Sequence, residues 1–78
     1  MQIRQLELLG TPGCHLCDLA ETLIAGCLDL SRVEVELIDI AQTDDLMARY
    51  GIKIPVLRCT KTQTELCWPF DALTVKAF

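Results

Sequence analysis

Two cysteines separated by two residues, Cys14 and Cys17, are the side chains of this sequence best suited to carry out chemistry. On a helix, side chains three positions apart lie on the same face. The two sulfur atoms can therefore meet as a disulfide or separate as two thiols with little movement of the backbone. The same pair could instead pack in the interior or bind a structural metal, so the spacing alone leaves three uses open.

The position of the pair favours redox chemistry. Residues 3–9 read as a strand with Leu6 and Leu8 on one face, and residues 10–13 (Gly-Thr-Pro-Gly) read as a turn. Apolar residues then recur with helical spacing to about Asp29, so a helix begins at the pair, capped by either Thr11 or Cys14. The free N–H groups and partial positive charge of a helix N-terminus stabilise a thiolate and lower the pKa of a cysteine.

The two cysteines are not expected to be equivalent. Cys14 lies at the exposed end of the helix, where it has the strongest dipole and the best access. Cys17 lies one turn further in, next to Leu16 and Leu19, which we expect to be buried. We therefore expect Cys14 to be the nucleophile and Cys17 to be the resolving thiol.

The remaining segments complete an α/β pattern. We expect a strand at 33–40 and a helix at 43–51 between Thr43 and Gly51. A hairpin of strands at 54–59 and 65–68 follows, and then a short helix beginning at Pro69 with Leu73 and Phe78 facing inward. The order β-α-β-α-β-β-α predicts a four-stranded mixed sheet with a parallel start, an antiparallel edge and flanking helices.

Length and composition exclude several classes of protein. A chain of 78 residues, 51% of them apolar, forms one domain and is too apolar to be disordered. Its seven basic residues are scattered and outnumbered by eleven acidic ones, giving a net charge of -4, so we expect no nucleic-acid partner. No apolar run approaches the ~18 residues of a membrane span, and the start lacks a signal-peptide pattern. We therefore expect no membrane partner and a cytoplasmic location.

Three motifs give the sequence a resemblance to a known family: Cys-His-Leu-Cys-Asp at 14–18, Ile-Pro-Val-Leu at 54–57 and Trp-Pro-Phe-Asp at 68–71. Together they resemble a group of short glutaredoxin-like proteins of the thioredoxin superfamily, and the resemblance covers essentially the whole chain. It implies one glutaredoxin-like domain over residues 1–78 with a thioredoxin-like fold. It also implies that Pro55 is a cis-proline facing the redox pair and that the backbone of Ile54 is presented to substrate. Without the family, Pro55 is only a proline at a strand entry.

Glutathione binding is not favoured by the sequence. Ordinary glutaredoxins carry a basic residue before the cysteine motif and a Gly-Gly followed by Asp near the last helix, whereas residues 10–13 here are uncharged and Trp68-Pro69-Phe70 replaces the glycines. Asp71 remains, as a substrate ligand or a helix cap. No cofactor is required for the expected chemistry, and no metal site is predicted. His15 could stabilise the Cys14 thiolate or be an exposed bystander.

The function predicted from these observations is that of an enzyme, a thiol–disulfide oxidoreductase, acting as a monomer on a disulfide-containing protein or a small thiol. A metal or iron–sulfur carrier and a non-catalytic thioredoxin-like binding module remain alternatives. Of the other cysteines, Cys27 falls on the apolar stripe of the first helix. Cys59 and Cys67 lie on the two hairpin strands, where proximity would permit a disulfide or part of a metal site, although packing is the favoured role.

Overall fold

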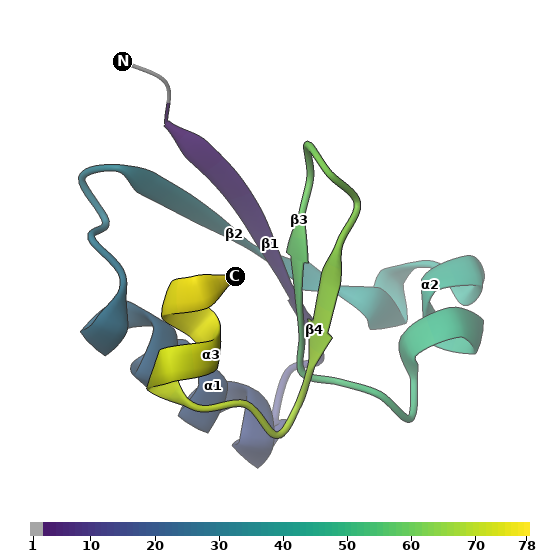
Figure 1. Ribbon diagram of the computed structural model, residues 1–78. Coiled ribbons are helices and arrows are strands. Elements are labelled where there is room, and N and C mark those ends of the chain that lie inside the picture. Colours follow the sequence, from purple (N-terminus) through teal and green to yellow (C-terminus); the bar gives the residue numbers. More distant parts are fainter. Residues whose placement is uncertain (1–2) are drawn as a thin grey trace.

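The computed structural model describes residues 3–78 and shows the expected α/β order, with one short 3-10 helix added (Figure 1). The strands form one sheet in the order β2-β1-β3-β4, in which β1 is parallel to β2 and antiparallel to β3, and β3 is antiparallel to β4. The predicted mixed sheet is confirmed. The elements are β1 (Arg4–Gly10), α1 (His15–Cys27), β2 (Val33–Asp39), η1 (Ile40–Gln42), α2 (Asp44–Tyr50), β3 (Val56–Cys59), β4 (Glu65–Cys67) and α3 (Ala72–Ala77).

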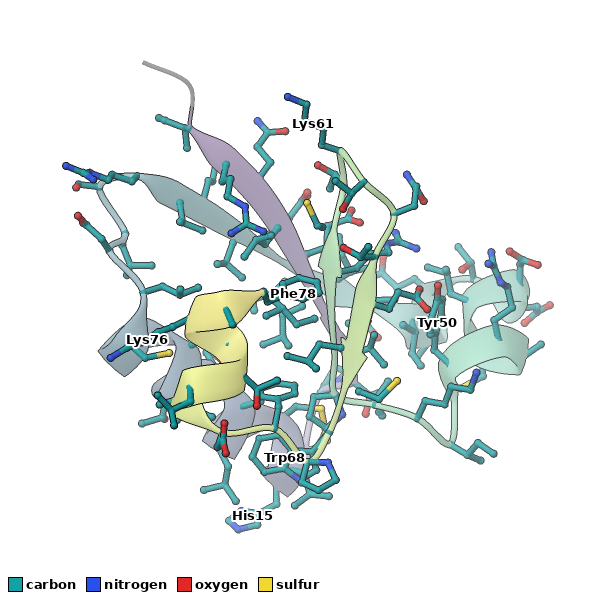
Figure 2. The ribbon with its side chains drawn as sticks, viewed as in Figure 1. His15, Tyr50, Lys61, Trp68, Lys76 and Phe78 are labelled. Atoms are coloured by element: carbon teal, nitrogen blue, oxygen red, sulfur yellow. A yellow bond between two sulfur atoms is a disulfide. The ribbon has the colours of Figure 1, made fainter. Side chains whose placement is uncertain are left out.

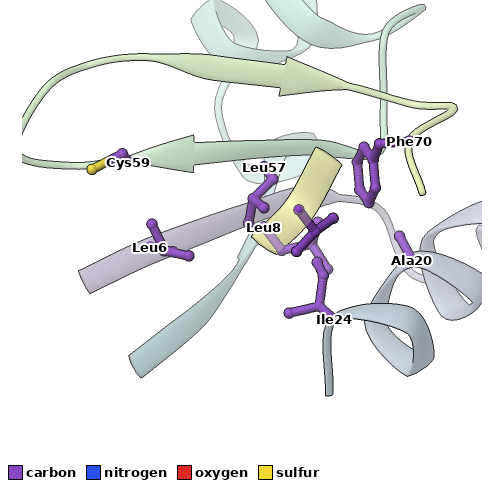
Figure 3. Packing of buried hydrophobic residues seen from close by; sticks show 8 residues of the cluster. Leu6, Leu8, Ala20, Ile24, Leu57, Cys59 and Phe70 are labelled. Atoms are coloured by element: carbon purple, nitrogen blue, oxygen red, sulfur yellow. The ribbon is translucent and has the colours of Figure 1, made fainter. Parts of the chain in front are cut away.

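Apolar side chains cover both faces of the sheet. On one face, α1 and α3 pack over Leu6, Leu8 and Leu57 through Ile24 and Val75 (Figure 3). On the other face, η1 and α2 pack through two side chains, Ile40 and Tyr50, against Leu9 and Val56. The neighbours Leu8 and Leu9 therefore face different layers, as the alternation of a strand requires. The sheet is thus the middle layer of three.

Short polar side chains set the starts of the helices. Cys14 caps α1, and its sulfur accepts a hydrogen bond from the backbone N–H of Cys17. Of the two expected caps for α1 it is therefore Cys14, and not Thr11, that is used. The predicted cap Thr43 begins α2, where its hydroxyl accepts from the N–H of Leu46. Asp71 caps α3.

Three leucines expected to face inward are exposed. Leu16 and Leu19 are each 45% exposed, because the part of α1 that packs on the core begins at Ala20. Leu73 is 78% exposed and Val75 takes the inward position instead. Two helical residues two positions apart point about 200° apart, so a six-residue helix with Val75 buried must expose Leu73.

A polar cluster joins the sheet to α2 on the second face. The guanidinium of Arg58 donates to the carboxylate of Glu7 at 2.9 and 2.7 Å, and both side chains are mostly buried. Arg58 also donates to the hydroxyl of Tyr50 at 3.2 Å, and that hydroxyl donates to the carboxylate of Glu65. The last residue of α2 is thereby tied to three strands.

The hairpin register separates the two cysteines that the sequence placed on it. Cys67 lies opposite Val56, whereas the N–H of Cys59 bonds to the carbonyl of Thr64. Three steps along a strand correspond to about 10 Å, so Cys59 and Cys67 are too far apart to form a disulfide. Within residues 3–78, no helix combines the length and apolar character needed to cross a membrane.

Candidate active site

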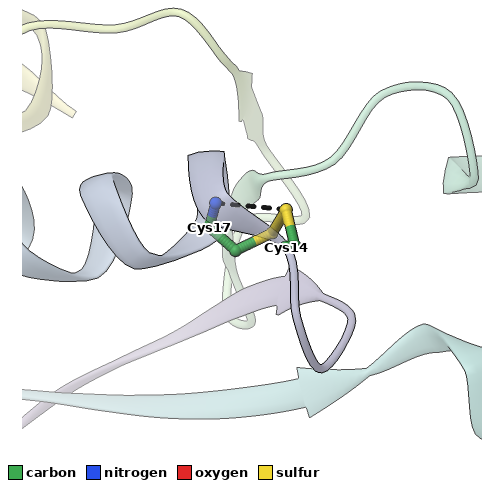
Figure 4. Close-up of a disulfide and its surroundings, with 2 residues drawn as sticks. All are labelled: Cys14 and Cys17. Carbon is green, nitrogen blue, oxygen red and sulfur yellow. Dashed lines mark hydrogen bonds between the residues drawn. A yellow bond between two sulfur atoms is a disulfide. The ribbon is translucent and has the colours of Figure 1, made fainter.

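Cys14 and Cys17 meet at the start of α1 (Figure 4). Their Cα atoms are 5.2 Å apart and their sulfur atoms lie at disulfide-bonding distance. Cys14 has the extended backbone of a cap residue, with φ −79° and ψ 109°, and its sulfur lies 3.1 Å from the backbone nitrogen of Cys17. A backbone N–H and the positive end of α1 thus both point at the Cys14 sulfur, where negative charge would develop on a thiolate.

Gly10, the last residue of β1, makes room for the Cys17 side chain. A β-carbon added at Gly10 would lie 2.7 Å from the Cys17 sulfur and 3.3 Å from its Cβ. No ordinary side chain fits at that separation. The glycine is needed because the sulfur approaches the strand backbone directly, and not because of the backbone conformation of the turn.

The register of the sheet brings Pro55 to the same end of β1. Leu9 pairs with Val56, and one further step along this antiparallel register sets Pro55 opposite Gly10. Gly10 in turn closely approaches Cys17. Pro55 is buried, its peptide bond with Ile54 is cis, and its carbonyl accepts from the N–H of Trp68 at 3.0 Å. Cys17 and Pro55 therefore both lie near the last residue of β1.

Ile54 is only partly available to a substrate. Its N–H already donates to the carbonyl of Tyr50 at 3.2 Å. Any main-chain contact that Ile54 makes with a substrate therefore falls to its carbonyl. The bond between Trp68 and Pro69 is also cis, which the sequence did not predict.

His15 is the first residue of α1, and its exposed side chain projects away from the sheet (Figure 2). Two acidic side chains, Asp18 and Glu21, lie exposed further along the same helix. The polar side chains that follow Cys14 along α1 thus include an imidazole one residue away and carboxylates one and two turns away.

Asp71 is used as a helix cap. Its Oδ1 accepts from both the N–H of Thr74 at 2.8 Å and the hydroxyl of the same residue at 2.7 Å. The backbone N–H bond and the hydroxyl bond hold the pKa of the Asp71 carboxyl below its usual value. The sequence left open whether Asp71 is a substrate ligand or a helix cap. The structure shows the hydrogen bonds of a cap, both to Thr74. Next to it, Phe70 is buried and packs edge-on against Trp68 with ring centroids 5.0 Å apart.

Cys59, for which the sequence favours a packing role, has a lowered pKa. It is buried opposite Leu6, toward the other end of β1 from Gly10. Hydrogen bonds from the hydroxyl and N–H of Thr62, aided by the N–H of Lys61 and by Arg4, lower its pKa to about 7 against the opposing effect of burial. The sequence signal was the polar turn of residues 60–64 directly after the cysteine.

The described part of the chain shows no cluster of three or more His, Cys, Asp or Glu residues arranged to hold a metal ion. The arrangement around Cys14 and Cys17 is suited to thiol–disulfide exchange: one sulfur faces a backbone N–H, the second sulfur lies at bonding distance from it, and Pro55 lies at the same end of the sheet.

Residues 5–78 match the model of the family described as "Glutaredoxin-like domain (DUF836)". The X-ray structure of the Northeast Structural Genomics target protein XcR50 from X. campestris is similar, with 35% sequence identity, a TM-score of 0.81, and 92% of this chain and 91% of that chain covered. The solution structure of XcR50 gives 35% identity, a TM-score of 0.78, and coverage of 92% and 87%. No curated protein matches the chain.

Proposed function

We propose that this chain, which belongs to the glutaredoxin-like family, is a thiol–disulfide oxidoreductase that cycles Cys14 and Cys17 between a dithiol and a disulfide. The family match and the similar solved structures bear out the expected glutaredoxin-like identity and thioredoxin-like fold. The observation that carries the proposal is the hydrogen bond from the Cys17 N–H to the Cys14 sulfur at the start of α1, with the Cys17 sulfur within bonding reach.

The proposed reaction begins with the reduced pair. The Cys14 thiolate attacks one sulfur of a substrate disulfide, forms a mixed disulfide, and displaces the other substrate sulfur as a thiolate that takes a proton from water. The Cys17 thiol then loses its proton and attacks the Cys14 sulfur, which releases the second substrate thiol. Two electrons have passed from the protein to the substrate, and Cys14 and Cys17 are left as a disulfide.

A second thiol couple must return these electrons. An external dithiol, or two monothiols in succession, would reduce the Cys14–Cys17 disulfide and complete the cycle. The uncharged residues 10–13 and the use of Asp71 as a cap support a donor other than glutathione, because no basic side chain lies directly before the motif to bind a glutathione carboxylate. No cofactor is required in this scheme.

The other site residues have supporting roles in the proposal. Ile54 and Pro55 lie at the same end of the sheet as the pair, so the Ile54 carbonyl would accept one hydrogen bond from a substrate backbone. His15, when protonated, would stabilise the thiolate of Cys14 beside it. Asp71 would serve substrate only through an oxygen not used in the cap.

The proposal is tested by turnover with two electron donors. Reduction of a protein disulfide would be followed with glutathione and glutathione reductase, and separately with a thioredoxin reductase system, for the wild type, Cys14→Ser, Cys17→Ser and Cys67→Ser. We expect turnover with the reductase system, loss of turnover in Cys14→Ser, and unchanged turnover in Cys67→Ser, the exposed free cysteine. Full activity in Cys14→Ser would refute the assignment. An inactive wild type would favour a binding module.

A further inference from the structure

An open, largely apolar groove runs between α1 and β2. Its larger hollow, of about 430 Å³, is lined by Ile24 of α1 and by Val35 of β2, with three exposed apolar side chains at its rim: Ile3, Leu30 and Leu37. The rim side chains are 57%, 58% and 59% exposed. Isolated exposed leucines are ordinary, but three around one hollow indicate a surface that is covered during function.

The groove continues to the redox pair. A second hollow of about 270 Å³ shares Leu8, Glu21 and Leu37 with the first and ends against Gly10 and Cys17. Residues of β2 from Val33 to Asp39 line the two hollows, so the groove follows this strand over its whole length. Seven strand residues span about 20 Å, which is the length of roughly six residues of extended peptide.

The charges along the groove have one sign. The described residues that line the two hollows include four acidic ones and no lysine or arginine: Asp18, Glu21, Glu34 and Asp39. An apolar floor with an acidic border is complementary to a segment that alternates apolar and basic side chains. It disfavours a second copy of this chain, because a symmetric pair over the groove would set Glu21 and its neighbours against their own copies.

From this geometry we infer that the groove between α1 and β2 binds an extended, apolar and basic segment of the protein whose disulfide is exchanged at Cys14 and Cys17. The inference deepens the proposed function and rests on it. Glu21 is the key specificity residue, because it borders both hollows and lies one turn from Cys17.

Two pairs of synthetic peptides test the inference. In the first pair, each hexapeptide carries one cysteine in disulfide linkage to thionitrobenzoate, and leucine alternates with lysine in one and with glutamate in the other. Attack by Cys14 on the peptide sulfur releases the coloured thionitrobenzoate, and Cys17 then displaces the peptide. The second pair has serine in place of cysteine and a fluorescein label, so that its binding is read by fluorescence anisotropy whether or not the protein is redox-active.

Matched variants isolate the groove from the net charge. Glu21→Lys and Glu36→Lys change the charge equally, but Glu36 borders neither hollow. At low ionic strength we expect the wild type and Glu36→Lys to prefer the lysine peptides by about tenfold in both kcat/KM and affinity. We expect Glu21→Lys to lose this preference and Leu37→Ser to weaken the binding of the lysine peptide. The rate of each variant with a peptide is divided by its rate with neutral bis(2-hydroxyethyl) disulfide. This small substrate does not need the groove, so its rate reports any direct effect of a substitution on the reactivity of Cys14.

The outcomes separate the inference from the function. Reduction of the neutral disulfide with no preference between peptides, or a preference that Glu21→Lys retains, overturns the groove assignment and leaves the oxidoreductase intact. Binding of the lysine peptide with no disulfide reduced overturns the oxidoreductase, and with it the coupling of the groove to exchange. A dimer in sedimentation equilibrium that Leu37→Ser dissociates would assign the groove to a second copy and also overturn the inference.

Discussion

The Cα of Gly10 lies against the sulfur of Cys17, so closely that a β-carbon on Gly10 would approach that sulfur to 2.7 Å. This contact joins the end of β1 to the redox pair on α1. It also places the two cysteines relative to Pro55, because the register of β1 and β3 sets Pro55 opposite Gly10. The motifs at 14–18 and 54–57, which are far apart in the sequence, are therefore both positioned against the last residue of β1.

Gly10→Ala should disturb the pair more when it is oxidised than when it is reduced. A disulfide holds the Cys17 sulfur in place, whereas a free thiol can rotate away from the added methyl group. We expect the oxidised protein to lose about 1–3 kcal/mol of unfolding free energy, the usual cost of overpacking, and the reduced protein to lose less. Urea denaturation with and without reductant measures both values.

Gly26→Ala is the matched control. Gly26 lies within α1, and a β-carbon there would meet nothing within 4 Å. Alanine is the better helix former, so we expect a gain of about 0.5–1 kcal/mol that is the same in both redox states. A loss of stability in Gly26→Ala, or an equal loss of the two redox forms in Gly10→Ala, would show that the Gly10 contact is misread.

Tyr50→Phe should loosen α2 from the sheet. The hydroxyl accepts from Arg58 and donates to Glu65, so its removal leaves a charged group on each side without that partner. We expect a loss of about 2 kcal/mol in unfolding free energy. A double-mutant cycle with Glu65→Gln should give a coupling above about 0.5 kcal/mol. Additive effects of the two substitutions would contradict the observed network.

The stability of the protein should rise as the pH increases from 7 to 9. The pKa of Cys59 is about 7 in the fold, below the value of 9.0 for a free thiol. Between these values the folded state holds a thiolate while the unfolded state still holds the proton, so the unfolded state binds more protons and stability increases with pH. The contribution is complete above the unfolded pKa and is lost as the pH falls through 7.

Cys59→Ser provides the comparison for that measurement. The unfolding free energy of this variant, followed by urea denaturation from pH 6 to 10, should lack the rise seen in the wild type. The ultraviolet absorbance of thiolate should likewise lose one step near pH 7. A wild-type curve that matches the Cys59→Ser curve would mean that the Thr62 hydroxyl and N–H do not stabilise the thiolate.

The sequence predicted the elements and the redox pair well because the signals for both are local. Helical spacing, turn residues and the caps Thr43 and Cys14 each depend on a few adjacent residues. Leu16 and Leu73 were misplaced because an apolar residue is buried only where another layer covers it, which periodicity does not reveal. The groove beside Cys17 was missed for the same reason, since it arises from segments that meet only in the fold. The low pKa of Cys59 has a more local origin in Thr62, but a polar turn in a sequence does not by itself reveal that its groups face the sulfur.

The central claim, that Cys14 attacks and Cys17 resolves, is tested most directly by trapping the mixed disulfide. Reduced Cys17→Ser and reduced Cys14→Ser would each be mixed with a disulfide-bonded protein, and the adducts mapped by mass spectrometry of proteolytic peptides. We predict one equivalent of substrate on Cys14 in Cys17→Ser, and no adduct on Cys17 in Cys14→Ser. Substrate accumulating on Cys17, or on neither residue, would contradict the account.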